Sequence, residues 1–297
     1  MSGGAAVREF DRALFQTRSI QVGAFRCHPN HPCFHDSGPA TGFCFVFPRT
    51  AVEIQHEHER AFVANPNVVT FYNKGQAYLR NAISNEGDRC DWFGVSPDIA
   101  RDVIRAYDPE VDDRPERPFR FTRGVAPATT YLVQRRVFDA VAGGVQTDLL
   151  GIEEAVVSLL DQVVAAAYER KRESRISRHA REMVHAVEKI LSERWHEQLT
   201  LDEIASEVGL SVYHLCRVFR DTTGISQHQY RLRLKARRSL EMVRESDAGL
   251  VDIALESGFC THSHFSASFR HEFGMTPSAV RAARSQQDLA QDLDSGR

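Results

Sequence analysis

The sequence predicts an α+β protein in which a β-rich N-terminal part is followed by an all-α C-terminal part. Three observations predict this order. Short runs of β-branched and aromatic residues, separated by turn residues, lie between positions 42 and 72. Apolar residues then recur three or four positions apart between 149 and 167. After residue 200 the chain twice repeats a short amphipathic segment, a glycine and a second amphipathic segment.

The composition is that of an ordinary globular protein. The chain has 297 residues, a length typical of about two domains, with 42% hydrophobic and 26% charged residues. It contains no run of about 18 apolar residues, and its first ten residues lack the pattern of a secretory signal. Its six cysteines form no C-x-x-C pair, so we expect free thiols and no disulfide framework. These features predict a cytoplasmic protein.

The charge is unevenly distributed along the chain. Residues 1–170 hold 18 Lys and Arg against 22 Asp and Glu, whereas residues 171–284 hold 18 against 15. A basic C-terminal part beside an acidic N-terminal part is expected when one domain meets phosphate groups. The overall net charge of -3 does not by itself indicate a nucleic-acid-binding protein.

The β-rich part contains three clear strand candidates. They cover 42–48, 52–56 and 68–72, and Pro, Asn and Gly residues at the intervening turns separate them. Many short strands with turn signals are typical of a small barrel or a roll of two sheets.

A helical period replaces the strand pattern after residue 127. Over 147–170, one face carries an apolar stripe, and Thr147 or Asp148 can cap the start of this helix. The stripe consists of Leu149, Ile152, Val156, Leu159, Val163 and Ala167. Two interpretations remain open: the stripe packs against the domain's own sheet, or it forms a dimerisation helix. A polar, charged segment follows, so we place a domain over 1–172 and a linker over 173–178.

The C-terminal domain, over 179–284, contains two helix-turn-helix units at 201–220 and 250–270, and a polar tail follows over 285–297. In each unit a glycine suited to a left-handed helix end precedes a hydroxyl residue that can cap the next helix: Gly209 and Ser211, then Gly258 and Thr261. A helix fits the major groove of B-DNA when a second helix braces it at a fixed angle, which a tight glycine turn provides.

Residues 179–284 closely resemble the DNA-binding domain of the AraC/XylS family of transcription regulators. The second unit carries most of the resemblance, through Gly258-Phe259, His264-Phe265-Ser266, Phe269-Arg270, Phe273-Gly274, Thr276-Pro277-Ser278 and Arg281. The resemblance implies that a long helix joins the two units. The segment from 226 to 244, with its basic run Arg231, Arg233, Lys235, Arg237 and Arg238, matches that helix.

By position, the resemblance also implies which residues contact DNA. Bases would be contacted by Tyr213, Cys216 and Arg217 in the first unit and by His262, Ser263 and Ala267 in the second. Phosphates would be contacted by Arg220, Arg231, Arg233 and Arg270. Many relatives carry arginine at the position of Ala267, so this residue leaves room for an apolar contact to a thymine methyl group.

For residues 1–172 the resemblance implies a cupin-like β-barrel with helices that senses a signal and sometimes dimerises. We therefore expect a regulator that binds duplex DNA and a small-molecule effector. We expect it to act as an activator that recruits RNA polymerase, and a homodimer is one open arrangement. An effector must bind one of two conformational states better than the other to act in this way.

A cluster of cysteines and histidines leaves a second hypothesis open, that of a metal-responsive or thiol-responsive regulator. Thiolates and imidazoles at this density suit zinc or another transition metal, although C-x5-C is not a standard zinc-finger spacing. Thiol-based redox sensing is the other possibility. The candidate residues are Cys27, Cys33, Cys90, His31, His56 and His58.

A third hypothesis, a cupin-type enzyme, finds little support. His56 and His58 supply an H-x-H pair, but residues 61–64 contain no acid and no histidine occurs from 59 to 178. The sequence contains no Gly-rich phosphate loop and no G-x-S-x-G motif. We therefore assign no catalytic residue and expect a protein that is not an enzyme.

Overall fold

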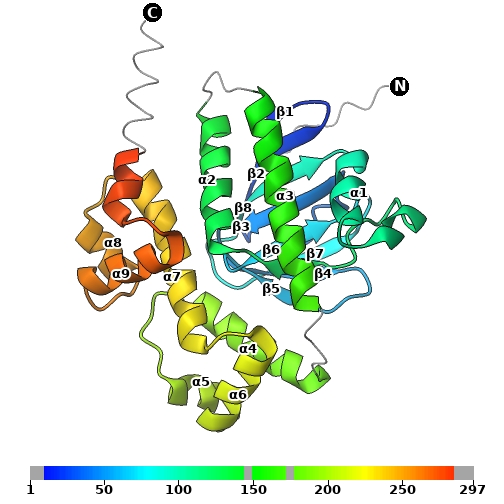
Figure 1. Cartoon of the computed structure of the whole chain (residues 1–297). Helices are drawn as coiled ribbons and strands as arrows, with labels where there is room; N and C mark the ends of the chain where they lie inside the picture. Colours follow the sequence, from blue (N-terminus) through cyan, green and yellow to red (C-terminus); the bar gives the residue numbers. More distant parts are fainter. Residues whose placement is uncertain (1–9, 144–148, 172–176, 284–297) are drawn as a thin grey trace, which may run out of the picture. The chain divides into compact units, whose positions relative to one another are not determined.

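The computed structural model describes residues 10–143, 149–171 and 177–283. The chain divides into two compact units, Met1–Glu173 and Ser174–Arg297. Within the described chain, the first unit contains all the strands, three α-helices and one 3-10 helix, and the second contains helices alone (Figure 1). The expected α+β order, with a β-sheet region followed by a helical region, is therefore confirmed.

The strands of the N-terminal unit pair into two antiparallel sheets. The six-stranded sheet runs in the order β1 (Asp11–Gln16), β2 (Ile20–Cys27), β8 (Asp88–Val95), β3 (Phe43–Pro48), β6 (Val68–Tyr72) and β9 (Arg123–Val125). The three-stranded sheet runs in the order β5 (Phe62–Ala64), β4 (Val52–His56) and β7 (Tyr78–Ala82). Within the described residues, no strand pair joins one sheet to the other.

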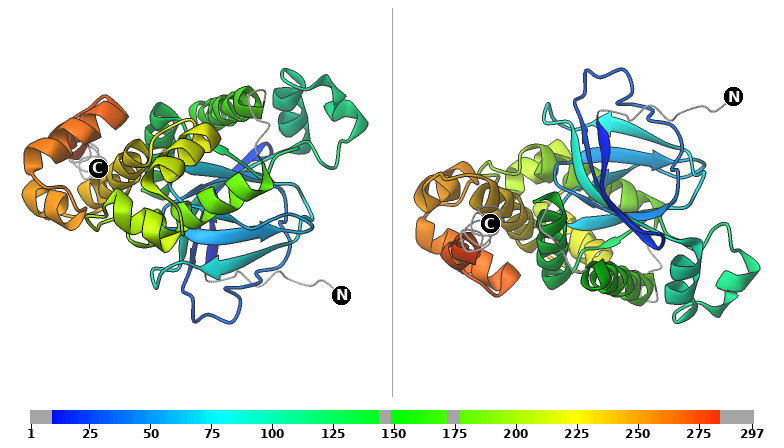
Figure 2. Two further views of the ribbon diagram at one scale, coloured as in Figure 1. Left: turned by 90° about the horizontal axis from the view of Figure 1, so that it is seen from below. Right: turned by 90° about the horizontal axis from the view of Figure 1, so that it is seen from above.

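One face of the six-stranded sheet is covered by two helices, α2 (Ala128–Ala142) and α3 (Leu149–Lys171), as Figures 1 and 2 show. Phe45, Phe47 and Phe93 alternate with residues of the opposite face along β3 and β8, and all three are fully buried. The rings of Phe45 and Phe93 stack with centroids 5.3 Å apart, and Phe47 contacts Tyr131 of α2. The aromatic run of β3 therefore builds the layer between sheet and helices.

The apolar stripe of α3 is buried inside its own unit. Ile152, Val156, Leu159, Val163 and Ala167 are all buried, whereas Leu149, at the start of the helix, is 61% exposed. The burial agrees with the interpretation that the stripe packs against the domain's own residues. The two capping candidates, Thr147 and Asp148, lie outside the described residues. The shorter helices α1 (Pro97–Arg105) and η1 (Pro109–Asp113) precede β9.

A buried charge network fastens α2 to the sheet. Asp91 on β8 is fully buried and pairs with Arg135 of α2, and Arg26 lies 2.9 Å from the same carboxylate. Burial opposes ionisation of Asp91, but the charges of Arg135, Arg49 and Arg26 outweigh it and lower its pKa. The carboxylate is therefore ionised, and it holds the side chains of Arg26, Arg49 and Arg135 beside β8.

The C-terminal unit consists of α4 (Arg178–Glu193), α5 (Leu201–Glu207), α6 (Val212–Thr223), α7 (Gln227–Glu245), α8 (Leu250–Glu256) and α9 (His262–Phe273). Ser177 caps α4 by accepting a hydrogen bond from the Ala180 amide, 3.2 Å away. The last two residues of the predicted linker, 177 and 178, therefore belong to the start of α4. The rest of the linker up to 176 and the predicted tail lie outside the described residues.

In the part of the chain that the structure describes, no helix combines the length and the apolar character needed to cross a membrane.

Candidate nucleic-acid interface

The first helix pair, α5 and α6, is fixed by three local features. Thr200 and Glu203 form a capping box at the start of α5, with the Thr200 amide donating to Glu203 over 2.7 Å. Gly209 then adopts a left-handed conformation with φ 68°. Ser211 caps α6 by accepting a hydrogen bond from the His214 amide. These features set the angle between the two helices.

The second pair, α8 and α9, repeats this construction with a longer turn. Gly258 adopts φ 73°, and Thr261 caps α9 by accepting a hydrogen bond from the His264 amide over 3.1 Å. A Cβ atom at Gly258 would collide with the backbone oxygen of His196, so glycine is needed here for space as well as for conformation. Four residues separate α5 from α6, whereas five separate α8 from α9.

Each recognition helix buries an aromatic side and exposes a polar side. Leu215 and Phe219 of α6 are buried in a cluster that includes residues of α4 and α5. In α9, Phe265, Phe269 and Phe273 are buried and contact one another edge to face, with centroids 4.7 to 5.6 Å apart.

The exposed sides of α6 and α9 correspond position by position. Tyr213, Arg217 and Arg220 lie two, six and nine residues after the cap Ser211, and all three are exposed. Ser263, Ala267 and Arg270 occupy the same places after the cap Thr261 and are also exposed. Tyr213 is 76% exposed, which is unusual for an aromatic side chain without a partner surface.

The remaining predicted base contacts lie beside these rows. His262 is exposed at the first position of α9, and Cys216 is half-buried on α6. Ser266 is the α9 counterpart of Cys216 and is half-buried in the same way. Ser266 is not among the predicted base contacts, although it lies as far from Thr261 as Cys216 lies from Ser211.

The four predicted phosphate contacts fall into two groups. Arg220 and Arg270 are exposed in the last turns of their helices. Arg231 and Arg233 lie on α7 and have partners within the unit. Arg231 donates to the Leu199 carbonyl oxygen over 2.7 Å, and Arg233 lies 3.5 Å from the Glu272 carboxylate.

The rest of the basic run on α7 holds the two helix pairs together. Lys235 is 2% exposed, and its Nζ donates to the carbonyl oxygens of Gly258 (2.6 Å) and Glu197 (3.3 Å). Burial lowers the pKa of Lys235 to about 8, and the neighbouring Arg231 adds to this effect. Arg237 is fully buried and pairs with Glu272 of α9 at 2.6 Å. This run therefore positions the two recognition helices from inside.

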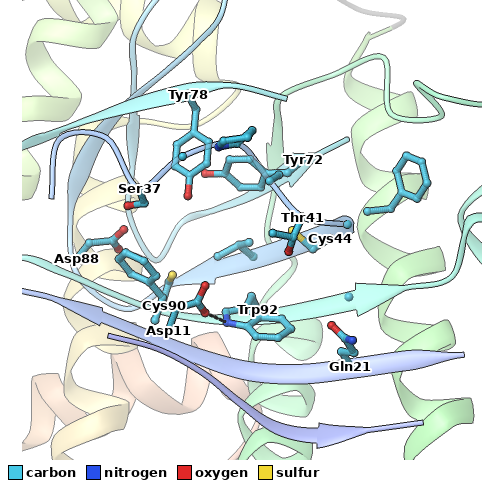
Figure 3. Close-up of a pocket in the computed structure, with 18 of the residues that line it drawn as sticks. Asp11, Gln21, Ser37, Thr41, Cys44, Tyr72, Tyr78, Asp88, Cys90 and Trp92 are labelled. Atoms are coloured by element: carbon cyan, nitrogen blue, oxygen red, sulfur yellow. Dashed lines mark hydrogen bonds between the residues drawn. The ribbon is translucent and has the colours of Figure 1, made fainter. Parts of the chain in front are cut away.

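The N-terminal unit contains a cavity of about 130 Å³ between its two sheets (Figure 3). Its lining includes Tyr72, Tyr78, Arg80, Asp88 and Trp92, none of which stands out in the sequence. Arg80 pairs with Asp88, and the Trp92 indole nitrogen donates to Asp11 over 2.9 Å. No spacing in the sequence brings these residues together, because they come from β6, β7 and β8, which belong to two different sheets.

The predicted sensing cysteines are placed as follows. Cys27 and Cys90 are buried, Cys33 is half-buried, and Cys90 lines the cavity together with Cys44. Burial, together with the nearby Asp88 carboxylate, raises the pKa of both Cys27 and Cys90. Burial also raises the pKa of Cys44 to about 12. Cys27, Cys44 and Cys90 are therefore protonated at neutral pH, which disfavours their reactivity as thiolates.

The predicted sensing histidines do not come together. His56 is 1% exposed and stacks on Tyr72, with ring centroids 4.9 Å apart, whereas the His58 side chain is 89% exposed. The strand β4 ends at His56 and His58 adopts φ 62°, which is why the two rings do not share a face. His31 lies edge to face with Phe10. Across residues 10–143, 149–171 and 177–283, no three His, Cys, Asp or Glu side chains form a metal-binding group.

Two solved structures are similar to this chain over part of its length. One is a transcriptional regulator with an AraC-type DNA-binding domain from Chromobacterium violaceum, 29% identical, covering 37% of this chain and 98% of its own, with a TM-score of 0.34. The other is ToxT from Vibrio cholerae, 12% identical, covering 89% of this chain and 98% of its own, with a TM-score of 0.36.

Residues 204–283 match the family model of a helix-turn-helix domain. The transcriptional activator RhaS of Escherichia coli O139:H28 is 32% identical over 94 residues, which cover 32% of this chain. The chain spans about a third of the length of the curated relatives it matches. The chain thus contains a double helix-turn-helix domain. The residues of its second unit resemble those of AraC-type DNA-binding domains.

Proposed function

We propose that this chain is a transcription regulator that binds a specific duplex DNA sequence through α6 and α9. The observation that carries this proposal is the correspondence between the exposed rows of the two helices, each starting two residues after a hydroxyl cap. The matched relative RhaS is named as a transcriptional activator and not as an enzyme, in line with the sequence expectation.

In the proposed complex, α6 and α9 enter successive major-groove faces about 34 Å apart, one turn of the double helix. Arg217 is exposed and reaches a guanine edge with two hydrogen bonds, while Ala267 offers an apolar contact to a thymine methyl group. Tyr213, Cys216, His262 and Ser263 complete the base contacts. The two helices therefore differ in what they recognise.

Phosphate binding is assigned chiefly to Arg220 and Arg270, because both are exposed beside the base-contacting rows. Arg231 and Arg233 contribute less, since their guanidinium groups already contact Leu199 and Glu272. A phosphate would have to compete with these contacts, so these two residues support the domain more than they bind the DNA backbone.

For the N-terminal unit we propose a cupin-like roll that holds a small-molecule effector between its sheets. The cavity supports this role because it lies between strands of both sheets and is lined by apolar and polar groups together. Effector binding shifts the population between two conformations and so changes DNA binding or the recruitment of RNA polymerase. A homodimer, if formed, would use surfaces other than the buried stripe of α3.

Response to a metal or to an oxidant through Cys27, Cys33 and Cys90 is the alternative proposal. Burial raises the pKa of Cys27 and of Cys90 and keeps both thiols protonated, which counts against their reaction with an oxidant as thiolates. A variant with all three cysteines changed to alanine should keep its regulatory response. Loss of the response, with stoichiometric zinc in the wild-type protein, would favour the metal.

The proposed function is tested by genome-wide mapping of bound DNA, with wild type and Arg217→Ala compared. We expect discrete sites upstream of a small number of operons, sharing one motif, and loss of these sites in the variant. Val133→Ala, a change of an exposed residue on α2, is the control and should keep them. Scattered binding without a motif in the wild type would overturn the proposal.

A further inference from the structure

The cavity in the N-terminal unit is large enough for a single substituted ring. Its volume is about 130 Å³. An apolar cavity of about 150 Å³ in another protein binds benzene, so this cavity matches a ligand of similar or slightly larger size that extends toward its open side.

The walls are aromatic, which favours a flat ring. The rings of Phe25, Phe43, Tyr72, Tyr78 and Trp92 come from five different strands and line the same space. In Figure 3, Tyr72 and Tyr78 stand over Cys44, Cys90 and Trp92. Aromatic rings gain energy from offset or edge-to-face contacts with other rings, beyond the burial of their area.

Two features fix the position of Trp92 at the floor of the cavity. Its indole nitrogen donates to Asp11, and its ring lies over Gly23, the residue paired with it on β2. A Cβ atom at Gly23 would collide with the indole ring. The floor is therefore formed before any ligand arrives, which reduces the entropy lost on binding.

The charged groups in the lining are already paired. Among the described lining residues, Arg80 is the only Arg, Lys or His, and its guanidinium contacts Asp88, the Phe34 carbonyl oxygen and Ser37. Asp11 accepts a hydrogen bond from Trp92. An anionic ligand would lose its hydration without gaining a counter-charge, because Arg80 already pairs with Asp88, and a cationic ligand would meet Asp11 only in competition with the Trp92 indole.

Hydroxyl groups supply the polar contacts that remain. Burial raises the pKa of Tyr78 to about 12 and that of Tyr72 well above its usual value, so both phenols stay neutral. The Tyr78 oxygen lies 3.5 Å from Nη2 of Arg80, which leaves its proton to be donated elsewhere. A ligand hydroxyl can accept that proton and donate its own.

We infer that the cavity binds an uncharged single-ring aromatic compound with one hydroxyl group, a simple phenol. This inference rests on the proposed role of the N-terminal unit as a sensor. It specifies the class of effector through the size of the cavity, its aromatic walls and its internally paired charges.

The test uses the full chain and four probes that share one ring: 4-methylphenol, toluene, benzoate and benzylamine. Calorimetric titration should show one site for 4-methylphenol, with benzoate and benzylamine at least about tenfold weaker. Tyr78→Phe should weaken 4-methylphenol about fivefold to tenfold while leaving toluene unchanged. Tighter binding of benzoate or benzylamine than of 4-methylphenol would overturn the inference.

A second variant locates the site. Val46→Phe places extra volume in the cavity, because Val46 lines it, and should abolish binding of 4-methylphenol while circular dichroism stays native. Leu79→Phe, on the partly exposed side of β7, is the matched control and should bind normally. Unchanged binding in a folded Val46→Phe protein would also overturn the inference.

The ligand inference and the proposed function fail separately. Specific binding to the mapped DNA is measured by fluorescence anisotropy without any probe. If DNA binding is specific and no phenol binds, the ligand class is wrong and the regulator remains. If no specific DNA binding is found, the proposed function itself is wrong, whatever the cavity binds.

Discussion

Arg217 is the exposed cation on α6 that most directly tests base recognition. Arg217→Ala should lower affinity for the specific site by about 1–3 kcal/mol and change affinity for random DNA much less. Arg220→Ala, one turn along the same exposed side, is the matched comparison. It should weaken both kinds of DNA and reduce the salt dependence by about one counterion. Equal losses for Arg217→Ala on both DNAs would reassign Arg217 to phosphate contact.

His56 gives the N-terminal unit a dependence on pH. Its burial lowers its pKa to about 4, below the value of about 6.5 in an unfolded chain. The neutral ring therefore favours the folded state above pH 6.5, and this contribution of about 3 kcal/mol is lost as pH falls from 6.5 to 4.

Calorimetric unfolding of wild type and His56→Phe between pH 7 and 4.5 checks this expectation. The variant retains a ring that can stack on Tyr72 but cannot be protonated, so its melting temperature should fall less with acid. His58→Phe, which changes an exposed histidine, should follow the wild type. If the melting temperatures of wild type and His56→Phe fell equally with acid, the pH dependence assigned to the burial of His56 would be contradicted.

At the level of single residues, the exposed rows of α6 and α9 follow from the sequence more readily than the lining of the cavity. The rows follow from helical spacing after Ser211 and Thr261, which is local information. Tyr78 and Trp92 line the same cavity although β7 and β8 belong to different sheets. No spacing along the chain encodes that proximity. For the proposed sensing histidines, local spacing is misleading. Two histidines in an H-x-H pair lie on one face of a strand, but β4 ends at His56 and His58 lies beyond it.

Among the secondary-structure elements, α7 differs most from the role that its sequence suggests. Its basic run suggests a DNA-facing surface, yet Lys235 and Arg237 are buried and contact Gly258 and Glu272. Glu272 lies 35 residues after Arg237, so neither charge density nor periodicity could identify this pairing. Lys235 and Arg237 therefore belong to the interior of the C-terminal unit.

Lys235→Met tests the role of α7 as the support of the second turn. The change leaves the carbonyl oxygens of Gly258 and Glu197 without this donor and should lower unfolding free energy by about 1–3 kcal/mol. DNA affinity should fall on every sequence, because the angle between the helix pairs is no longer held. Lys189→Met, at an exposed position of α4, should change neither quantity measurably.

Strand β8 makes a comparable test possible in the N-terminal unit. Asp91→Asn removes the charge that holds Arg135 and Arg49 in the interior and should lower unfolding free energy by about 3–5 kcal/mol. Asp139→Asn affects only the partly exposed partner of Arg135, so urea unfolding should show a loss of about 1 kcal/mol. Similar losses of unfolding free energy in both variants would show that the buried ion pairs of Asp91 stabilise the fold no more than the partly exposed pair of Asp139.

On the scale of the whole molecule, the order of a β-rich and a helical part follows from hydrophobic period and turn residues alone. The start of α4 at Arg178 lies one residue before the predicted start of the C-terminal domain, whereas α6 and α9 end three residues beyond the predicted ends of their units. What joins the strands into two sheets is long-range pairing, such as that of β2 with β8, across more than 60 residues. Local pattern predicts that strands exist but not which strands are neighbours.

The two turns of the C-terminal unit differ by one residue, and the two exposed rows differ at Arg217 and Ala267. A chain that contacts DNA in this way has no internal two-fold symmetry, so its binding site has a direction. Reversing the site in front of a gene would exchange which of α6 and α9 lies nearer the promoter. A regulator built like this distinguishes upstream from downstream as a single copy, which a symmetric pair of identical helices on a palindrome cannot do.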